Sequence, residues 1–152
     1  MLKIGSKAPE FQLSDQDSNM VNISDFKGQK VLLWFYPKAS TPGWTIQGKG
    51  LRDEFKKFKD KNTVIIGMSA ASVKAQKNFS TKQDFQFKLL SDPEKETIRS
   101  YDAMGIKKMY GREYEGILRI AYLIDEQGKI EKSYEKVSPK THADEVLQDL
   151  SQ

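Results

Sequence analysis

The residues best placed to do chemistry lie in the segment 34–45, where a short apolar run leads into a loop and the loop leads into an expected helix. The first-turn amides of a helix have no acceptor within the helix and carry partial positive charge. A junction of this kind stabilises an anion, whether a thiolate or a bound oxyanion. The pattern therefore predicts a nucleophile near position 44. The residue there is Trp44, whose indole has one N–H donor and no acidic proton at neutral pH, so it cannot attack a substrate.

Two residue types that often carry catalysis are scarce. The chain contains no cysteine and a single histidine, His142. The lack of cysteine excludes disulfides, thiolate metal sites and thiol catalysis for the chain as it stands. One histidine is too little for a histidine-rich metal site, and any Ser/His/Asp triad would have to use it. We expect no metal and no cofactor. His142 begins an expected amphipathic helix, and because buried imidazoles need partners we expect it on the surface.

The composition indicates one folded domain spanning residues 1–152. Apolar residues make up 38%, aromatic residues 11% and charged residues 30% of the chain, which is typical of a globular rather than a disordered protein. No apolar run approaches the roughly 18 residues of a membrane span, and residues 1–7 lack the apolar core of a signal peptide. We therefore expect a cytoplasmic protein. The 25 basic and 21 acidic residues give a net charge of +4, with no basic run long enough to indicate nucleic-acid binding.

Hydrophobic period and turn residues predict the elements that position this segment. The run 31–36 is apolar throughout and too short for a typical helix, which indicates a strand covered on both faces. Leu51, Phe55 and Phe58 recur at i, i+4 and i+7 and so share one helical face. Residues 107–115 show no clear period and are expected to form a polar loop. Strands are expected at 11–14, 20–23, 30–36, 63–68, 87–90, 118–124 and 129–134, and helices at 41–58, 72–82, 92–104 and 141–150.

This order predicts an α/β thioredoxin-like fold with an N-terminal β-hairpin and a central helical insertion. Strands that alternate with helices require a parallel core sheet, and the closing ββα unit adds antiparallel strands and a covering helix. A flavodoxin-like fold is the weaker alternative, because it would need further βα units at the C-terminus. Ligands in such sheets bind at the carboxyl ends of the strands, where the loop 37–44 is expected.

The same loop resembles a known signature. The pattern Pro37-x-x-x-Thr41-x-x-Trp44 resembles the peroxiredoxin signature Pro-x-x-x-Thr-x-x-Cys, with tryptophan in the cysteine position. Its surroundings, Phe-Tyr-Pro-Lys at 35–38 and Thr-Pro-Gly at 41–43, resemble the bacterioferritin-comigratory (Q-type) subgroup. The resemblance extends along nearly the whole chain, with further similar segments at 5–13, 89–93, 116–128 and 137–147.

The resemblance implies a thioredoxin-dependent peroxidase that reduces hydrogen peroxide and organic hydroperoxides. Position 44 would carry the peroxidatic thiolate, and the backbone amides of Gly43 and Trp44 would bind the peroxide oxygens. Thr41 would hydrogen-bond the thiolate and the peroxide, and Pro37 would shield them from water. Arg119 would lower the thiol pKa and polarise the peroxide. The resemblance also favours a monomer.

Three departures from the subgroup pattern stand out. Trp44 replaces the nucleophile, which is decisive because the family reaction needs a thiolate. Lys49 occupies the position of the frequent resolving cysteine, a mild departure because single-cysteine members exist. Ala71 and Gln76 stand where an Asp and a His are often seen, which we take as peripheral to the chemistry.

Each site residue also has a purely structural explanation. Thr41 could be only a helix cap, and Pro42-Gly43 only a turn. Arg119 in an apolar strand could belong to a structural ion pair. Trp44 could fill the peroxide pocket or unwind the first helical turn.

Three functions follow for testing. The first is a thiol peroxidase whose nucleophile has been replaced, so that this chain is inactive. The second is a natural cysteine-free relative that serves as a binding or interaction module. The third, a nucleic-acid binder, is disfavoured because +4 over 152 residues is a weak field.

Overall fold

The apolar run that begins at Val31 lies in an interior strand of a seven-stranded sheet. A computed structural model describes residues 1–37 and 42–151, with the backbone alone for residues 42–44 and 109. Strand β3 (Lys30–Phe35) pairs in parallel with β4 (Thr63–Ser69) and antiparallel with β8 (Ala121–Ile124). The sheet order is β2-β1-β5-β4-β3-β8-β9. Its remaining strands are β1 (Gln12–Ser14), β2 (Met20–Asn22), β5 (Lys88–Ser91) and β9 (Ile130–Tyr134).

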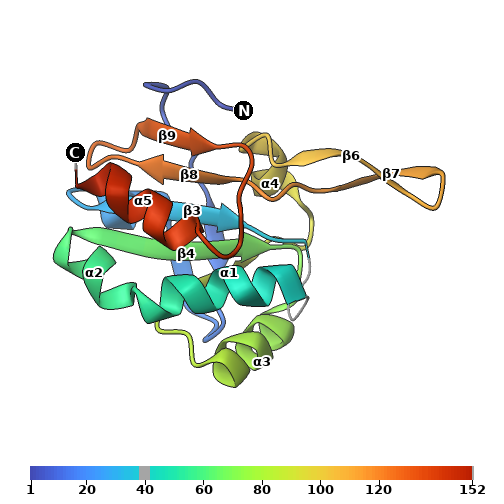
Figure 1. Ribbon diagram of the computed structural model, residues 1–152, viewed down its shortest axis with the longest axis horizontal. Helices are drawn as coiled ribbons and strands as arrows, with labels where there is room; N and C mark the ends of the chain where they lie inside the picture. The colour runs from blue at the N-terminus through green and yellow to red at the C-terminus, as the bar shows by residue number, and fades with distance from the viewer. Residues whose placement is uncertain (38–41, 152) are drawn as a thin grey trace.

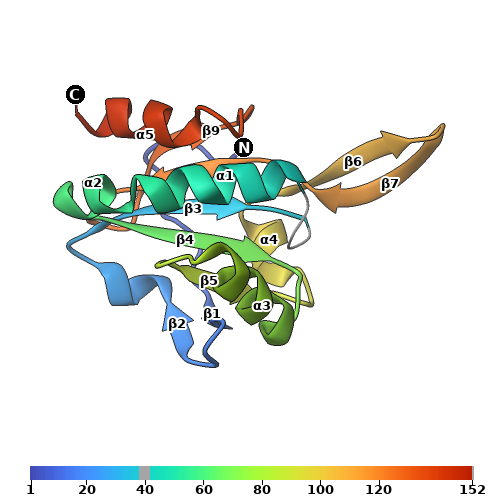
Figure 2. The ribbon, with the colours of Figure 1, turned by 60° about the horizontal axis from the view of Figure 1, so that its bottom comes forward.

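Helices cover both faces of this sheet (Figures 1 and 2). One core lies between the sheet and α1 (Pro42–Asp53), α2 (Phe55–Asp60), α3 (Val73–Gln83) and α5 (His142–Leu150). The other core lies beneath α4 (Glu96–Ser100), the short 3-10 helix η1 (Ile23–Phe26) and the N-terminal segment. Leu33 and Phe35 belong to this second core, whereas Leu32 and Trp34 belong to the first. The prediction of a strand buried on both faces is confirmed, and so is the thioredoxin-like α/β fold.

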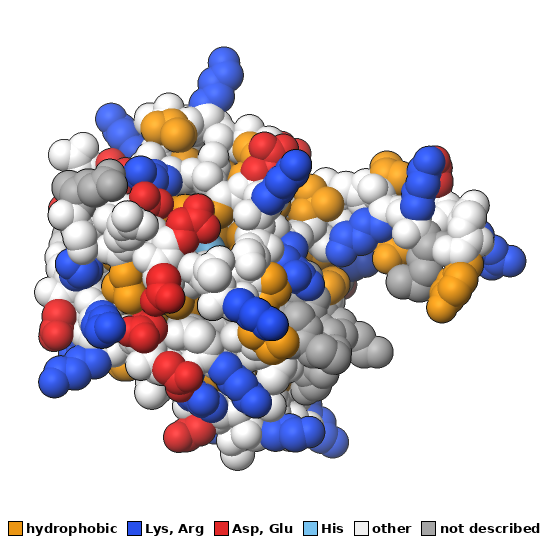
Figure 3. Space-filling view, in the orientation of Figure 1, with side chains coloured by type: hydrophobic (Ala, Val, Ile, Leu, Met, Phe, Trp, Pro, Cys, Tyr) orange, Lys and Arg blue, Asp and Glu red, His pale blue; other side chains and the backbone are white. Residues whose placement is uncertain are grey.

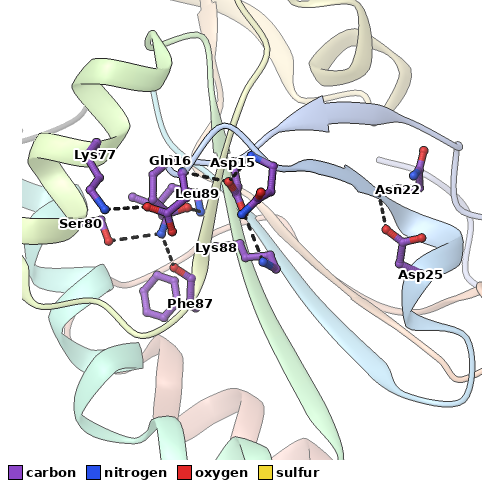
Figure 4. A network of polar contacts seen from close by, with 11 residues as sticks. Asp15, Gln16, Asn22, Asp25, Lys77, Ser80, Phe87, Lys88 and Leu89 are labelled. Carbon is purple, nitrogen blue, oxygen red and sulfur yellow. Dashed lines mark hydrogen bonds and ion pairs between the residues drawn. The ribbon is translucent and has the colours of Figure 1, made fainter.

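The N-terminal hairpin β1–β2 is tied to the sheet by polar contacts (Figure 4). Asp15 is 1% exposed, and its Oδ1 accepts hydrogen bonds from two amides of its own turn, at 2.9 and 3.0 Å. Its Oδ2 lies 3.2 Å from the Lys88 ammonium at the start of β5. The Gln16 side chain accepts a hydrogen bond from the Leu89 amide at 2.9 Å and donates one to the Phe87 carbonyl at 3.0 Å. These contacts fix the hairpin against β5.

Residues 107–115 are not a loop, contrary to the prediction. Strands β6 (Met104–Met109) and β7 (Arg112–Ile117) form an antiparallel hairpin that projects from the body (Figures 1 and 2). Tyr110 and Gly111, with φ of 52° and 76°, make the two-residue turn, as expected for turns whose central residues are left-handed. The hairpin buries little surface, so its sequence carries no regular apolar period.

Three other element boundaries differ from the prediction. Helix α4 spans five residues rather than 92–104, because the Asp92 carboxylate accepts the Ile98 amide at 2.8 Å and Lys95 adopts a left-handed backbone. The expected helix 41–58 is divided into α1 and α2 at Glu54. Strand β8 begins at Ala121 rather than at 118. The central insertion therefore consists of one short helix and the projecting hairpin.

Surface charge shows no single basic field on the face drawn in Figure 3, where basic and acidic side chains of the body alternate. Within residues 1–37 and 42–151, no helix has the length and apolar character needed to cross a bilayer.

Candidate active site

The candidate site begins where β3 ends. The Phe35 amide donates to the Ile120 carbonyl at 3.1 Å, and the Tyr36 amide donates to the Met68 carbonyl at 3.2 Å. The end of β3 is thus held from both sides, by the segment before β8 and by β4. Half-buried Pro37 follows directly. Its ring fixes its own φ, so the chain leaves the sheet in a restricted direction.

Helix α1 begins at Pro42, two residues before position 44. Gly43 and Trp44 are therefore in its first turn, where amides have no acceptor within the helix and contribute partial positive charge. Thr41 lies outside the described residues, and so does the Trp44 side chain. The predicted order of strand and helix is confirmed, because the strand ends at Phe35 and the helix starts at Pro42; the predicted loop falls largely outside the described residues.

Arg119 lies in the bend that precedes β8, and not within the strand as predicted. Its neighbour Ile120 bonds the end of β3 through the Phe35 amide, so the Arg119 backbone lies beside the segment that leads to Pro37. The half-buried Arg119 side chain lines a cleft of about 440 Å³. Burial lowers the pKa of Lys107 on the projecting hairpin, and the nearby positive charge of Arg119 lowers it further. Arg119 thus stands between the base of the hairpin and the end of β3.

A buried hydrogen-bond bridge supports the end of β3, and the sequence analysis missed it. The Tyr36 hydroxyl donates to the Gln76 Oε1 of α3 at 2.5 Å. The Gln76 amide nitrogen donates to the Ser69 hydroxyl at 3.1 Å and to the Leu90 carbonyl at 2.8 Å. Burial raises the pKa of Tyr36, which keeps the phenol protonated as a donor. The sequence analysis took Gln76 as peripheral to the chemistry and did not consider that a polar residue on the buried face of a helix requires partners.

Helix α1 carries further residues of interest after its first turn. Lys49, at the expected resolving position, is exposed. Gln47 is 1% exposed, and neither its amide nitrogen nor its oxygen has a hydrogen-bond partner among the described residues. A Cβ on Gly48 would lie 2.4 Å from the Phe85 ring, so this helix approaches α3 and the following loop more closely than any other residue type would allow.

His142 is buried, which contradicts the surface prediction. It is 0% exposed at the start of α5, and its ring meets the Tyr134 ring edge-to-face at 5.4 Å. Neither ring nitrogen has a partner in the described part of the chain. Burial lowers its pKa to about 4, so the imidazole is neutral at pH 7. The prediction assumed that a buried imidazole needs a polar partner, but here its partner is an aromatic ring.

Comparison with known proteins gives the family. The model of the AhpC/TSA family matches residues 4–133. Peroxiredoxin Bcp of Escherichia coli (strain K12) is 42% identical over 146 residues, which cover 96% of this chain and 94% of the relative. Peroxiredoxin Bcp of Bacillus subtilis (strain 168) is 39% identical over 149 residues, covering 98% and 95%.

Solved structures agree with this similarity. A structure of the Xanthomonas campestris bacterioferritin comigratory protein, from work on its alkyl peroxide reduction activity, superposes with a TM-score of 0.88 at 35% identity, covering 93% of this chain and 90% of that one. A cysteine-to-serine mutant of Xylella fastidiosa PrxQ superposes with a TM-score of 0.94 at 31% identity, covering 99% and 96%. With the family model matched over most of its length, this chain belongs to the AhpC/TSA family, as a peroxiredoxin of the Bcp/PrxQ type.

Proposed function

We propose that position 44 is the peroxidatic position of this peroxiredoxin and that Trp44 has replaced the nucleophile. The family is one of thiol peroxidases, and the spacing Pro37-x-x-x-Thr41-x-x-Trp44 points to residue 44. The observation that carries the loss of the nucleophile is the absence of any cysteine in all 152 residues. An indole has no ionisable proton or lone pair with which to open an O–O bond near neutral pH. The chain as it stands is therefore inactive as a thiol peroxidase.

Reduction of a hydroperoxide by a thiolate is the reaction expected at position 44. A thiolate at residue 44 would attack one peroxide oxygen, forming an S–O bond and breaking the O–O bond. Sulfur is oxidised to a sulfenic acid, and the departing oxygen leaves as hydroxide or alkoxide that takes up a proton. Both the thiolate and the leaving oxygen are anionic. The amides of Gly43 and Trp44, in the first turn of α1, would stabilise this charge.

The remaining roles are proposed residue by residue. Arg119 would favour the thiolate and polarise the peroxide, supported by its place beside the end of β3. Pro37 would shield the thiolate, supported by its half-buried position directly after the strand. Thr41 would hydrogen-bond the reacting atoms, which rests on its spacing from Pro37 and Trp44 alone.

Electrons in this family come from thioredoxin-type donors, and we propose the same class of donor for an active form of this chain. Because Lys49 stands at the resolving position, the donor would reduce the sulfenic acid directly. One donor thiol would form a mixed disulfide with release of water, and the second donor thiol would then free the thiol at position 44. We also propose that the protein is a monomer and that it is located in the cytoplasm. Sedimentation and cell fractionation test these two points.

The decisive experiment is Trp44→Cys, assayed for hydroperoxide consumption with a thioredoxin system. We expect turnover in the variant and none above background in the unaltered chain. Lys49→Cys is the matched control, because it places a thiol on the same helix at an exposed position. Turnover in the unaltered chain, or a folded Trp44→Cys protein no more active than Lys49→Cys, would refute the assignment.

A second function is favoured by one observation. Both the peroxidatic and the resolving positions lack cysteine, as does the rest of the chain, which fits a natural cysteine-free relative acting as a binding or interaction module. The codon for residue 44 in the source separates the two proposals. A tryptophan codon there supports the module, and a cysteine codon ends that proposal.

A further inference from the structure

We propose that Tyr36 and Gln76 are positioning residues, which hold the end of β3 so that the following loop presents position 44 for attack on a peroxide. This inference rests on the proposed function of position 44. Its basis is the 2.5 Å hydrogen bond from the Tyr36 hydroxyl to Gln76 Oε1, made one residue before Pro37 and the loop.

The bridge uses the full donor capacity of the Gln76 amide. A primary amide has two N–H donors, and those of Gln76 go to the Ser69 hydroxyl on β4 and to the Leu90 carbonyl on β5. The Ser69 oxygen also accepts the Ala71 amide at 3.1 Å. One side chain of α3 thereby joins the ends of three neighbouring strands, the same ends at which α/β sheets place their sites. A buried network with every member satisfied favours a single geometry.

Packing alone does not account for the Tyr36 hydroxyl. The Tyr36 ring lies 4.8 Å from the Trp34 ring and 5.8 Å from the Phe79 ring, within an aromatic core. A phenylalanine would make those same contacts without a polar group to bury. The hydroxyl instead adds a second fixed point, because the Tyr36 amide is already bonded to the Met68 carbonyl. The residue is held at both its main chain and its side-chain tip.

The position of Tyr36 in the chain gives this restraint a consequence. A residue held at two points, followed by a proline of fixed φ, sets the direction in which the loop leaves the sheet. A displacement of about 1 Å at a reacting group can reduce a rate by roughly a hundredfold. Loosening the bridge is therefore expected to affect chemistry at position 44 even though no atom of Tyr36 or Gln76 has to contact the peroxide.

The test uses the Trp44→Cys protein, in which the introduced thiol is the only one, since the chain has no other cysteine. Tyr36→Phe and Gln76→Met are added singly and together. Tyr101→Phe is the matched control, because its hydroxyl makes a 2.6 Å bond to the Pro9 carbonyl in the other core. Two quantities are measured: the thiol pKa, from the pH dependence of its alkylation by iodoacetamide, and kcat and KM for hydrogen peroxide.

We expect Tyr36→Phe and Gln76→Met each to lower kcat/KM about tenfold, mainly through kcat, and to raise the thiol pKa by about half a unit or more. The double variant should be little worse than either single one, because both break one bridge. Tyr101→Phe should lower thermal stability to a similar degree with the thiol pKa and kcat unchanged. Tyr36→Phe matching this control in pKa and kcat would overturn the proposal.

Failure of this inference is distinct from failure of the proposed function. If Trp44→Cys shows no turnover at all, the assignment of position 44 is refuted. The alkylation measurements still decide in that case whether the bridge sets the reactivity of a thiol at position 44, because they need only the thiol and a folded protein. An unchanged thiol pKa in both bridge variants would then reject it.

Discussion

Replacing His142 by phenylalanine is expected to remove a pH dependence from the stability of the protein. The imidazole is fully buried, and burial lowers its pKa from 6.5 to about 4. In the unfolded chain the same group titrates near its ordinary value. Below about pH 6.5 the unfolded state therefore binds a proton that the folded state rejects, so the free energy of unfolding falls as the pH falls.

The size of the effect follows from the two pKa values. Each unit of difference corresponds to about 1.4 kcal/mol, so the limit for the shift at His142 is about 3 kcal/mol. Between about pH 7 and about pH 5 the expected loss is about 2 kcal/mol. The loss approaches its limit only as the pH nears the folded-state pKa of about 4.

Urea denaturation of both proteins across this pH range measures the effect, because carboxylates common to both cancel in the difference. Phenylalanine keeps a ring against Tyr134, and it removes two nitrogens that have no partner in the described part of the chain. We expect the variant to be at least as stable near pH 7 and to gain about 2 kcal/mol relative to the unaltered chain near pH 5. A difference constant to within about 0.5 kcal/mol would show that the folded state accepts the proton as readily as the unfolded state.

Three further changes test the packing and turns described above. Gly48→Ala should lower the free energy of unfolding by about 1–3 kcal/mol, because its Cβ would lie 2.4 Å from the Phe85 ring. Gly50→Ala on the same helix is the control: its Cβ would lie 3.9 Å from the nearest side chain, and the higher helix propensity of alanine should raise the free energy of unfolding by about 0.5–1 kcal/mol. Urea denaturation compares the two variants. Asp15→Ala should cost about 2–3 kcal/mol and speed hydrogen exchange at the two turn amides that its carboxylate accepts; unaltered exchange there would contradict the role given to that carboxylate. Tyr110→Asn should slow amide exchange in the projecting hairpin, because asparagine suits its left-handed φ of 52° better than tyrosine; faster exchange would show that the tyrosine ring stabilises the turn.

The fold was predictable where burial or helix capping determines which residue types occur in the sequence. The run 31–36 is apolar because β3 lies between two cores, and Ser72 marks the start of α3 because its hydroxyl accepts the Ala75 amide at 3.1 Å. The projecting hairpin was missed because most of its side chains face solvent. Its one local signal was the pair Tyr110-Gly111, since glycine is the residue expected second in a left-handed two-residue turn.

The candidate site was predictable only in its chain order. The helix follows the strand along the sequence, so the place of position 44 at the start of α1 could be anticipated. The bridge could not, because Tyr36 and Gln76 are 40 residues apart and only the pairing of β3, β4 and β5 brings them together. The prediction that His142 lies on the surface failed for a different reason. The helical period places His142 on the buried face, four residues before Val146. The prediction instead relied on the need of an imidazole for a polar partner, whereas the partner is the Tyr134 ring.

Retention of the fold and retention of the nucleophile are separate, because this chain has the scaffold of its peroxiredoxin relatives without any cysteine. The cores are assembled from β3 and its neighbours together with later positions of the helices, such as Leu51 and Phe58. Position 44 lies in the first turn of α1, before these anchors. A peroxiredoxin scaffold can therefore be retained whether or not residue 44 is a nucleophile, and similarity to active relatives does not decide between a substituted enzyme and a binding module. The response of the Tyr36–Gln76 bridge to substitution does bear on that choice. A bridge that only stabilises the core suits either protein, whereas a bridge that sets the reactivity of a thiol at position 44 is a property expected of an enzyme's scaffold.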